Sequence, residues 1–241
     1  DGTVADAIYD HYKPLNLEDE CPRSVPGAVV SVADKFDAVV GAFPAGLVPT
    51  GSSDPFALRR QGNGIIKVLV EFGWRVQLKL LLLAGFDALL QQGLGPGFLD
   101  EAFNFLGERL RHYLESVRGL RYDTVRAVMA GSFGWNVPVD VLDCAQALEA
   151  IRGEEDFVGL SQAAKRIKNI LSKSARQEDL EEGWFEPSML EAGPERDLHD
   201  AYLLASERAA RHRESRDYAE ALSDIASLRP FVDRFFDAVL V

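Results

Sequence analysis

Apolar residues recur at three- and four-residue intervals along almost the whole chain, and no convincing apolar–polar alternation indicates a strand. The segment VPGAVVSVADKFDAVVG predicts a helix that begins near Pro26 and ends at Gly41. Its buried stripe is expected at Val29, Val32, Ala33, Phe36 and Val40. The same pattern predicts helices over 55–71, 78–90, 98–117, 122–131, 139–151, 158–173, 195–214 and 217–228, before a final apolar segment at 231–241. The chain is therefore expected to be all-α and built of helical bundles.

The tract QQGLGPG, residues 91–97, is the best candidate for a domain boundary. It places three glycines and a proline between two helical patterns, as connecting segments commonly do. We therefore expect one helical unit over residues 1–97 and a second over 98–241. A later tract, residues 175–194, loses the helical period and turns acidic, which indicates an excursion on the surface.

The net charge, the cysteines and the length of the apolar runs argue against several classes of protein. The 241 residues carry a formal net charge of −12, which argues against generic adhesion to nucleic acid or anionic membranes, so any RNA contact would need a local basic patch. The two cysteines, Cys21 and Cys144, lack the spacing of a zinc site and are typical of a reducing compartment. The longest apolar run is interrupted by Lys79 and Asp87 and is too short to span a bilayer. The opening DGTVADAIYDHY carries no signal-peptide pattern and no starting Met, and we expect the chain to be a piece of something longer.

The segment PTGSSDPFALRRQGNGIIKVL, residues 49–69, combines turn formers with the start of a helix. Asp54 and Pro55 form a good cap and first helical residue, and Gly62 and Gly64 predict close approach of another backbone. The segment lacks the GK[ST] ending of a phosphate-binding P-loop. Two readings stay open, a structural corner and a contact with RNA or a partner. The contact would use Arg59, Arg60 and Lys67.

The strongest basic tract is SQAAKRIKNILSKSARQ, residues 161–177, which contains no acidic residue. Its core stripe is expected at Leu160, Ala164, Ile167 and Leu171. That would leave Lys165, Arg166, Asn169 and Lys173 on exposed edges, where the cations would contact phosphates and the asparagine a base edge. A merely solvated helix is the alternative.

A second candidate lies in RLRHYLESVRGLRYDTVRAV, where arginines and tyrosines alternate. Arg109, Arg111 and Tyr113 could contact unpaired bases, although acidic neighbours could equally pair with the arginines along the helix. Asp34 and Asp37 could offer a carboxylate to a metal, but a solvated helix face explains them as well. The histidines are scattered, so we assign no catalytic residue and no metal site.

The densest signature in the chain is ADKFDAVVGAFPAGLVPTGSSDPFALRRQGNGIIKVLVE, residues 33–71, which resembles the signature of the bacterial glycyl-tRNA synthetase β subunit family. The resemblance continues in order through AIYDHYKP, FLGERLRHYL, YDTVRAV, AAKRIKNILSK and LRPFVDRFFDAVLV. It covers essentially the whole chain.

The resemblance implies a specific role. In this family two α and two β chains form a cytoplasmic ligase that joins glycine to tRNA-Gly using ATP and Mg²⁺. The α subunit activates glycine, and the β subunit recognises tRNA. Residues 1–97 would be the end of an HD-like helical domain with a connector. Residues 98–241 would be a DALR-type anticodon-binding domain that is truncated at its C-terminus.

The resemblance also distributes the candidate residues over two surfaces. The anticodon-facing surface is expected to contain Arg109, Arg111, Tyr113, Lys165, Arg166, Asn169 and Lys173. Arg59, Arg60 and Lys67 would contact the tRNA body or a neighbouring domain. The fragment alone is expected to hold no cofactor and to activate no glycine. Two alternatives are a metal-dependent HD phosphohydrolase that uses Asp34 and a helical scaffold without an RNA role.

Overall fold

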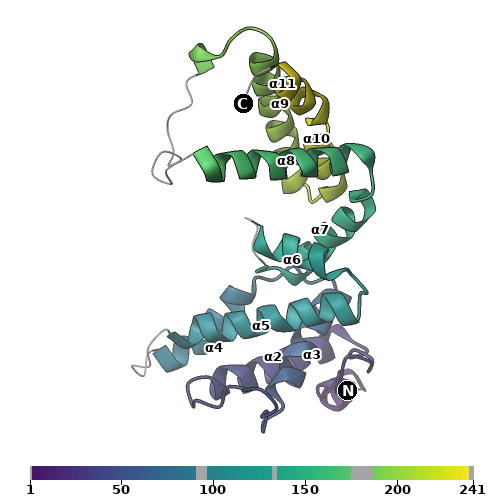
Figure 1. Cartoon of the computed structure of the whole chain (residues 1–241). Helices are drawn as coiled ribbons and strands as arrows, with labels where there is room; N and C mark the ends of the chain where they lie inside the picture. Colours follow the sequence, from purple (N-terminus) through teal and green to yellow (C-terminus); the bar gives the residue numbers. More distant parts are fainter. Residues whose placement is uncertain (1, 91–96, 132–134, 175–186, 239–241) are drawn as a thin grey trace. The chain divides into compact units, whose positions relative to one another are not determined.

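The computed structural model describes residues 2–90, 97–131, 135–174 and 187–238, apart from the side chains of 88–90, 173 and 174. All regular structure in these ranges is helical, and no strand occurs in them, which confirms the all-α prediction (Figure 1). The helices are α1 Gly2–Asp10, α2 Val25–Ala42, α3 Leu58–Glu71, α4 Leu78–Leu90, α5 Gly97–Ser116, α6 Tyr122–Ala130, α7 Pro138–Ile151, α8 Glu155–Ser174, α9 Pro194–Glu214, α10 Tyr218–Ala226 and α11 Arg229–Ala238, with a short 3₁₀ helix at Pro187–Met189.

The chain forms two compact units, Asp1–Ala145 and Gln146–Val241. This division lies inside α7 rather than near residue 97, because α5 packs against α3 and α4 and so belongs with the first unit (Figure 1). The glycine-rich tract that prompted the expected boundary falls largely outside the described residues. The assignment of HD-like and anticodon-binding domains to particular residues stays a prediction.

The core of the first unit lies among α2, α3 and α5, where most of the large aliphatic side chains of α3 and α5 are buried. On α2, Val32, Phe36 and Val40 are buried as predicted, but Val29 is 53% exposed and Ala33 is also exposed. The packed face of α2 is instead completed by Ser31, Val39 and Lys35, of which Lys35 is only 2% exposed.

Lys35 is buried because its ammonium group has polar partners inside the fold. Its Nζ donates to the carbonyl oxygens of His11, Tyr12 and Lys13 at 3.0 to 3.2 Å and to the Ser31 hydroxyl at 2.9 Å. Burial lowers the pKa of this amine, which measures the cost of removing its charge from water. The four acceptors offset that cost and tie the segment after α1 to α2.

The predicted cap of α3 is present, although the helix begins at Leu58 rather than Pro55. The Asp54 carboxylate accepts the backbone N–H groups of Leu58 at 2.7 Å and Arg59 at 3.0 Å. Between cap and helix, Ala57 takes a left-handed conformation with φ of +52°. A turn therefore precedes the helix, and Pro55 serves that turn.

The two glycines of α3 admit neighbouring side chains rather than another helix backbone. A Cβ atom on Gly62 would lie 2.8 Å from Cγ of Arg109 and 2.9 Å from Cε1 of Phe105, both on α5. On Gly64 a Cβ would lie 2.7 Å from Cε of Lys35. These contacts are shorter than side chains tolerate, so the absence of Cβ lets α2 and α5 approach α3.

Gly62→Ala is expected to lower the free energy of unfolding by roughly 1–3 kcal/mol, because overpacking at Arg109 and Phe105 outweighs the better helix propensity of alanine. Urea unfolding followed by circular dichroism measures the change. Gly41→Ala is the matched control, since Gly41 lies in α2 with nothing within 4 Å of its would-be Cβ. That control should be neutral or stabilising, and an equal gain at Gly62 would contradict the close contact.

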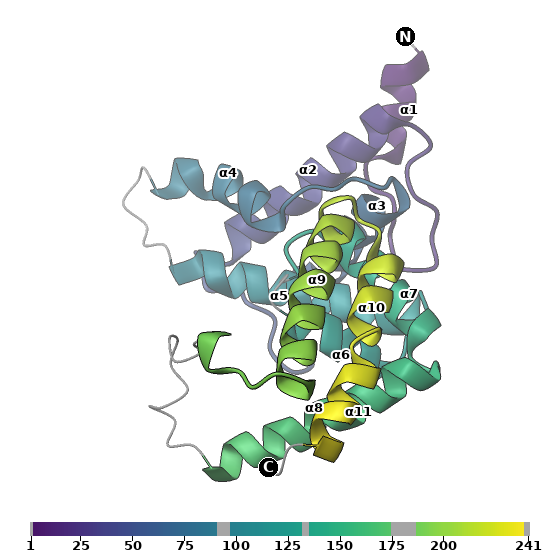
Figure 2. The same cartoon turned by 90° about the horizontal axis from the view of Figure 1, so that it is seen from above.

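In the second unit, α9 packs against α10 and α11, and α8 packs against α11 and α10 (Figure 2). Of the predicted core stripe of α8, Leu160 is half-buried, but the other three positions are wrong. Ala164 is exposed, Ile167 is 40% exposed and Leu171 is 43% exposed. The half-buried face of α8 is rotated by about a quarter turn from the predicted stripe. It contains Gly159, Ala163 and Ile170.

Gly159 explains part of this rotation. A Cβ there would lie 2.5 Å from Nε of Arg229 on α11, so glycine lets the Arg229 side chain cross close to α8 at this position. Arg229 also pairs with Glu155 and Asp156 at the start of α8, each at 3.1 Å. The packing of α8 against α11 is therefore partly ionic, which the apolar period could not indicate.

Candidate nucleic-acid interface

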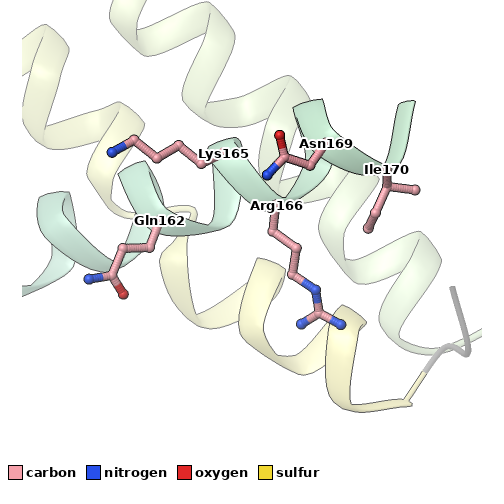
Figure 3. A pocket seen from close by; sticks show the side chains of 5 residues that line it. All are labelled: Gln162, Lys165, Arg166, Asn169 and Ile170. Atoms are coloured by element: carbon pink, nitrogen blue, oxygen red, sulfur yellow. The ribbon is translucent and has the colours of Figure 1, made fainter. Parts of the chain in front are cut away.

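Helix α8 carries an exposed hollow of about 500 Å³ on one face. Five side chains line it, Gln162, Lys165, Arg166, Asn169 and Ile170 (Figure 3). They follow one another at short helical intervals, so the helix itself brings them onto one side. The structure thus brings together three of the predicted contact residues, Lys165, Arg166 and Asn169. The fourth, Lys173, lies in α8, but its side chain is outside the described residues.

The positive charges of this face are not neutralised within the described residues. Lys165 and Arg166 are exposed and form no ion pair there, whereas nearby Arg229 is held by Glu155, Asp156 and Asp233. The guanidinium of Arg166 instead lies over the ring of Phe236 on α11, with 4.1 Å between its carbon and the ring centre. A ring orients the cation without cancelling its charge, so these cations remain available to an anion.

Phe236 and Ile170 were not among the residues predicted for the site. Phe236 lies in the FVDRFFDAVLV segment, which the sequence indicated only as an apolar segment. Its role depends on a contact between α8 and α11, which are far apart in the chain. Ile170 could have been found from its spacing to Arg166 if the packed face of α8 had been assigned correctly.

In the first unit, some of the predicted contact residues are buried rather than exposed. Tyr113 is fully buried, and its hydroxyl donates to the Glu71 carboxylate at 2.8 Å. This burial corrects its proposed role, because no face of the ring is open to a base. Arg109 has a side chain only 15% exposed and pairs with Glu108 at 3.6 Å, while Arg111 is exposed on α5.

The hydrogen bond of Tyr113 leads to a prediction about pH. Burial, aided by the hydrogen bond to Glu71, raises the pKa of Tyr113 above its usual range. The unfolded chain loses this proton near pH 10, while the folded chain retains it, so stability should fall as pH rises above about 10. The expected slope is up to about 1.4 kcal/mol per pH unit, measured by urea unfolding between pH 8 and 11. Tyr113→Phe removes the titrating group and should show a shallower decline; parallel curves would contradict the assignment.

Lys67 was predicted for the second surface, together with Arg59 and Arg60, but in the structure it connects two segments of the first unit. Its Nζ donates to the carbonyl oxygens of Leu17, at 2.7 Å, and Asp19, which fixes the segment before α2 to α3. Arg59 is half-buried and Arg60 is exposed at the start of α3. A role for these two arginines in RNA contact stays a prediction. So does a single surface formed by α5 and α8 residues, because they belong to different units.

The parts of the chain that the structure describes give little support for metal-dependent or thiol chemistry. Asp34 and Asp37 are exposed on α2, and no group of three or more His, Cys, Asp or Glu side chains there is placed to hold a metal ion. Cys21 and Cys144 are free, and burial raises the pKa of both thiols, which disfavours the reactive thiolate. None of the described helices is both long and apolar enough to cross a bilayer.

Comparisons with known proteins agree with the resemblance in residues 33–71. A family model described as glycyl-tRNA synthetase beta subunit matches residues 1–130. A glycine–tRNA ligase beta subunit from Acidobacterium capsulatum is 39% identical over 242 residues, covering 99% of this chain and 34% of the relative. Those of Desulfitobacterium hafniense and Halothermothrix orenii are 39% and 33% identical, with the same 34% of each relative covered. The chain therefore spans about a third of the length of these relatives. Matched by the family model over more than half its length, the chain belongs to the glycyl-tRNA synthetase beta subunit family.

Proposed function

We propose that this chain is a tRNA-recognition part of the β subunit of glycine–tRNA ligase and that its α8 face binds the anticodon region of tRNA-Gly. The observation that carries the proposal is the pair of exposed cations on this face, Lys165 and Arg166, without ion pairs among the described residues, in a chain with a net charge of −12. Cations without carboxylate partners gain most from a phosphate. The side-chain amides of Gln162 and Asn169 lie beside them for base edges.

In this proposal the chain acts by positioning. Contacts from Lys165 and Arg166 to phosphates set the register of the RNA, and the amides and the Arg166 plane add base-dependent contacts. A separate α subunit would activate glycine with ATP and Mg²⁺, in a cytoplasmic assembly of two α and two β chains. This part of the β subunit would supply no catalytic residue.

Binding of tRNA-Gly anticodon stem-loops, with natural and base-swapped anticodons, tests the proposal over a range of salt concentrations. We expect measurable affinity, a negative slope of log affinity against log salt, and weaker binding of the base-swapped loops. Equal affinity for all loops would remove the base-reading role and leave only phosphate binding.

Two alternative functions would give different results in assays of the same protein. An HD-type phosphohydrolase using Asp34 would hydrolyse phosphate esters when supplied with a divalent metal. A helical scaffold would bind neither stem-loop and hydrolyse nothing. The exposed cations of α8, which no described carboxylate pairs with, favour tRNA recognition over both.

A further inference from the structure

The Arg166 side chain has an unusual environment for an exposed arginine. Its guanidinium carbon lies 4.1 Å from the centre of the Phe236 ring, closer than the other described arginine–ring pairs at 5.7 to 5.8 Å. In Figure 3 the side chain extends from α8 toward α11. Since no carboxylate among the described residues pairs with it, the aromatic ring of Phe236 is what orients the guanidinium.

A guanidinium held in this way presents a flat cationic surface. An exposed guanidinium plane is suited to a flat π-system, and arginine planes commonly stack on unpaired nucleobases. A lysine at this position would offer only a point charge. A planar ligand is therefore suited to the Arg166 side chain, in addition to a phosphate.

The rest of the hollow complements a nucleotide. Gln162 and Asn169 are exposed and carry side-chain amides, which offer both donors and acceptors to the edge of a base. Lys165 is exposed beside them as a partner for a phosphate, and Ile170 adds an apolar wall. The volume of about 500 Å³ lies within the range of small-ligand sites.

We propose that the α8 hollow binds a single unstacked nucleotide, with its base on the Arg166 plane, its edge at Gln162 and Asn169, and its phosphate at Lys165. The inference rests on the proposed function for the identity of the RNA. It goes further in selecting one nucleotide of a single-stranded loop and in making Phe236 the residue that positions Arg166.

The test is an abasic scan with the 241-residue chain. Anticodon stem-loops of tRNA-Gly, each with one abasic nucleotide at a different loop position, are titrated by fluorescence anisotropy. At one position we expect removal of the base to weaken binding by roughly 5- to 150-fold, the range found for a base stacked on a side chain. At the other positions the hollow binds no base, and any weakening there should not depend on Arg166.

Two variants link that position to the hollow. Arg166→Lys keeps the charge but removes the plane, and Phe236→Leu keeps an apolar side chain but removes the ring. In both we expect the intact loop to bind more weakly and the sensitive abasic loop to bind no more weakly than the intact one. Arg208→Lys makes the same substitution at an exposed arginine of α9 and should leave the abasic pattern unchanged.

The outcomes separate this inference from the proposed function. If the loops bind but no abasic position depends on Arg166, the hollow binds phosphates only and the inference is overturned, while tRNA recognition stands. If no loop binds, both are overturned. A position-specific effect that disappears in Arg166→Lys and persists in Arg208→Lys supports the single-nucleotide site.

Discussion

Lys35→Met is expected to lower the free energy of unfolding by about 2–4 kcal/mol, because it removes the charged partner of several part-buried oxygens. Methionine retains an unbranched side chain of similar shape, so the packing against Gly64 is largely preserved. The substitution removes the ammonium group and its donors to His11, Tyr12, Lys13 and Ser31.

Two opposing effects decide the size of this change. Burying the ammonium costs free energy, as its lowered pKa indicates, and methionine relieves that cost. The carbonyl oxygens, however, remain inside the fold without this donor, and each unsatisfied group costs about 1–3 kcal/mol. The His11 and Tyr12 carbonyls lose this donor, while the Lys13 carbonyl still accepts from the Ser31 hydroxyl, and we expect the lost hydrogen bonds to outweigh the relief. The result would be a large share of the roughly 5–15 kcal/mol that stabilises a typical domain.

Urea unfolding followed by circular dichroism measures the effect as a lower midpoint with an unchanged slope. Lys79→Met is the matched control in the same unit. Lys79 is exposed, and its amine lies 4.7 Å from the centre of the Phe103 ring, so we expect a decrease of no more than about 1 kcal/mol. Equal midpoints for the Lys35 and Lys79 variants would show that the ammonium group does not hold the 11–13 segment.

The sequence predicts the helices of this fold well where local signals agree. The helical pattern over 78–90 coincides with α4, and the Asp54 carboxylate accepts from the first turn of α3 as predicted, although the helix begins at Leu58 and not at Pro55. Apolar spacing and side-chain capping depend on neighbours in the chain. They can therefore be predicted without knowing the tertiary structure.

The packed faces of α2 and α8 could not be predicted in the same way. Lys35 is buried because carbonyl oxygens from residues 11–13 converge on it, and Ile167 and Leu171 are exposed because Gly159 and Arg229 place α11 against another side of α8. Both depend on residues distant in sequence. Lys165, Arg166 and Asn169 are exposed as predicted, although the core stripe from which their exposure was inferred is largely wrong, because polar side chains favour a solvated edge in either register. The role of Phe236 required knowledge of how α11 packs.

Reversing the charges of Lys165 and Arg166 together is expected to weaken anticodon stem-loop binding by about tenfold or more at low salt. Neither residue forms an ion pair among the described residues, so glutamates there break no described ionic interaction and add repulsion toward phosphate. For each phosphate that is no longer neutralised, the salt slope should also fall by roughly 0.7 to 0.9. Both effects should appear in one set of titrations, as reduced affinity and as a flatter dependence on salt.

The fold should be unaffected by Lys165→Glu with Arg166→Glu, apart from the missing cation–π interaction with Phe236, which is worth about 1 kcal/mol or less at an exposed site. Circular dichroism and urea unfolding check this. Arg208→Glu on α9 of the same unit is the control for a change in overall charge, since Arg208 is exposed and outside the hollow. If the α8 variant binds like the wild-type chain, or if Arg208→Glu weakens binding as much, the α8 face does not bind the tRNA. A reduced affinity confined to the α8 variant would locate the binding face on α8, because Arg166 and Arg208 are both exposed and Arg208 lies outside the hollow.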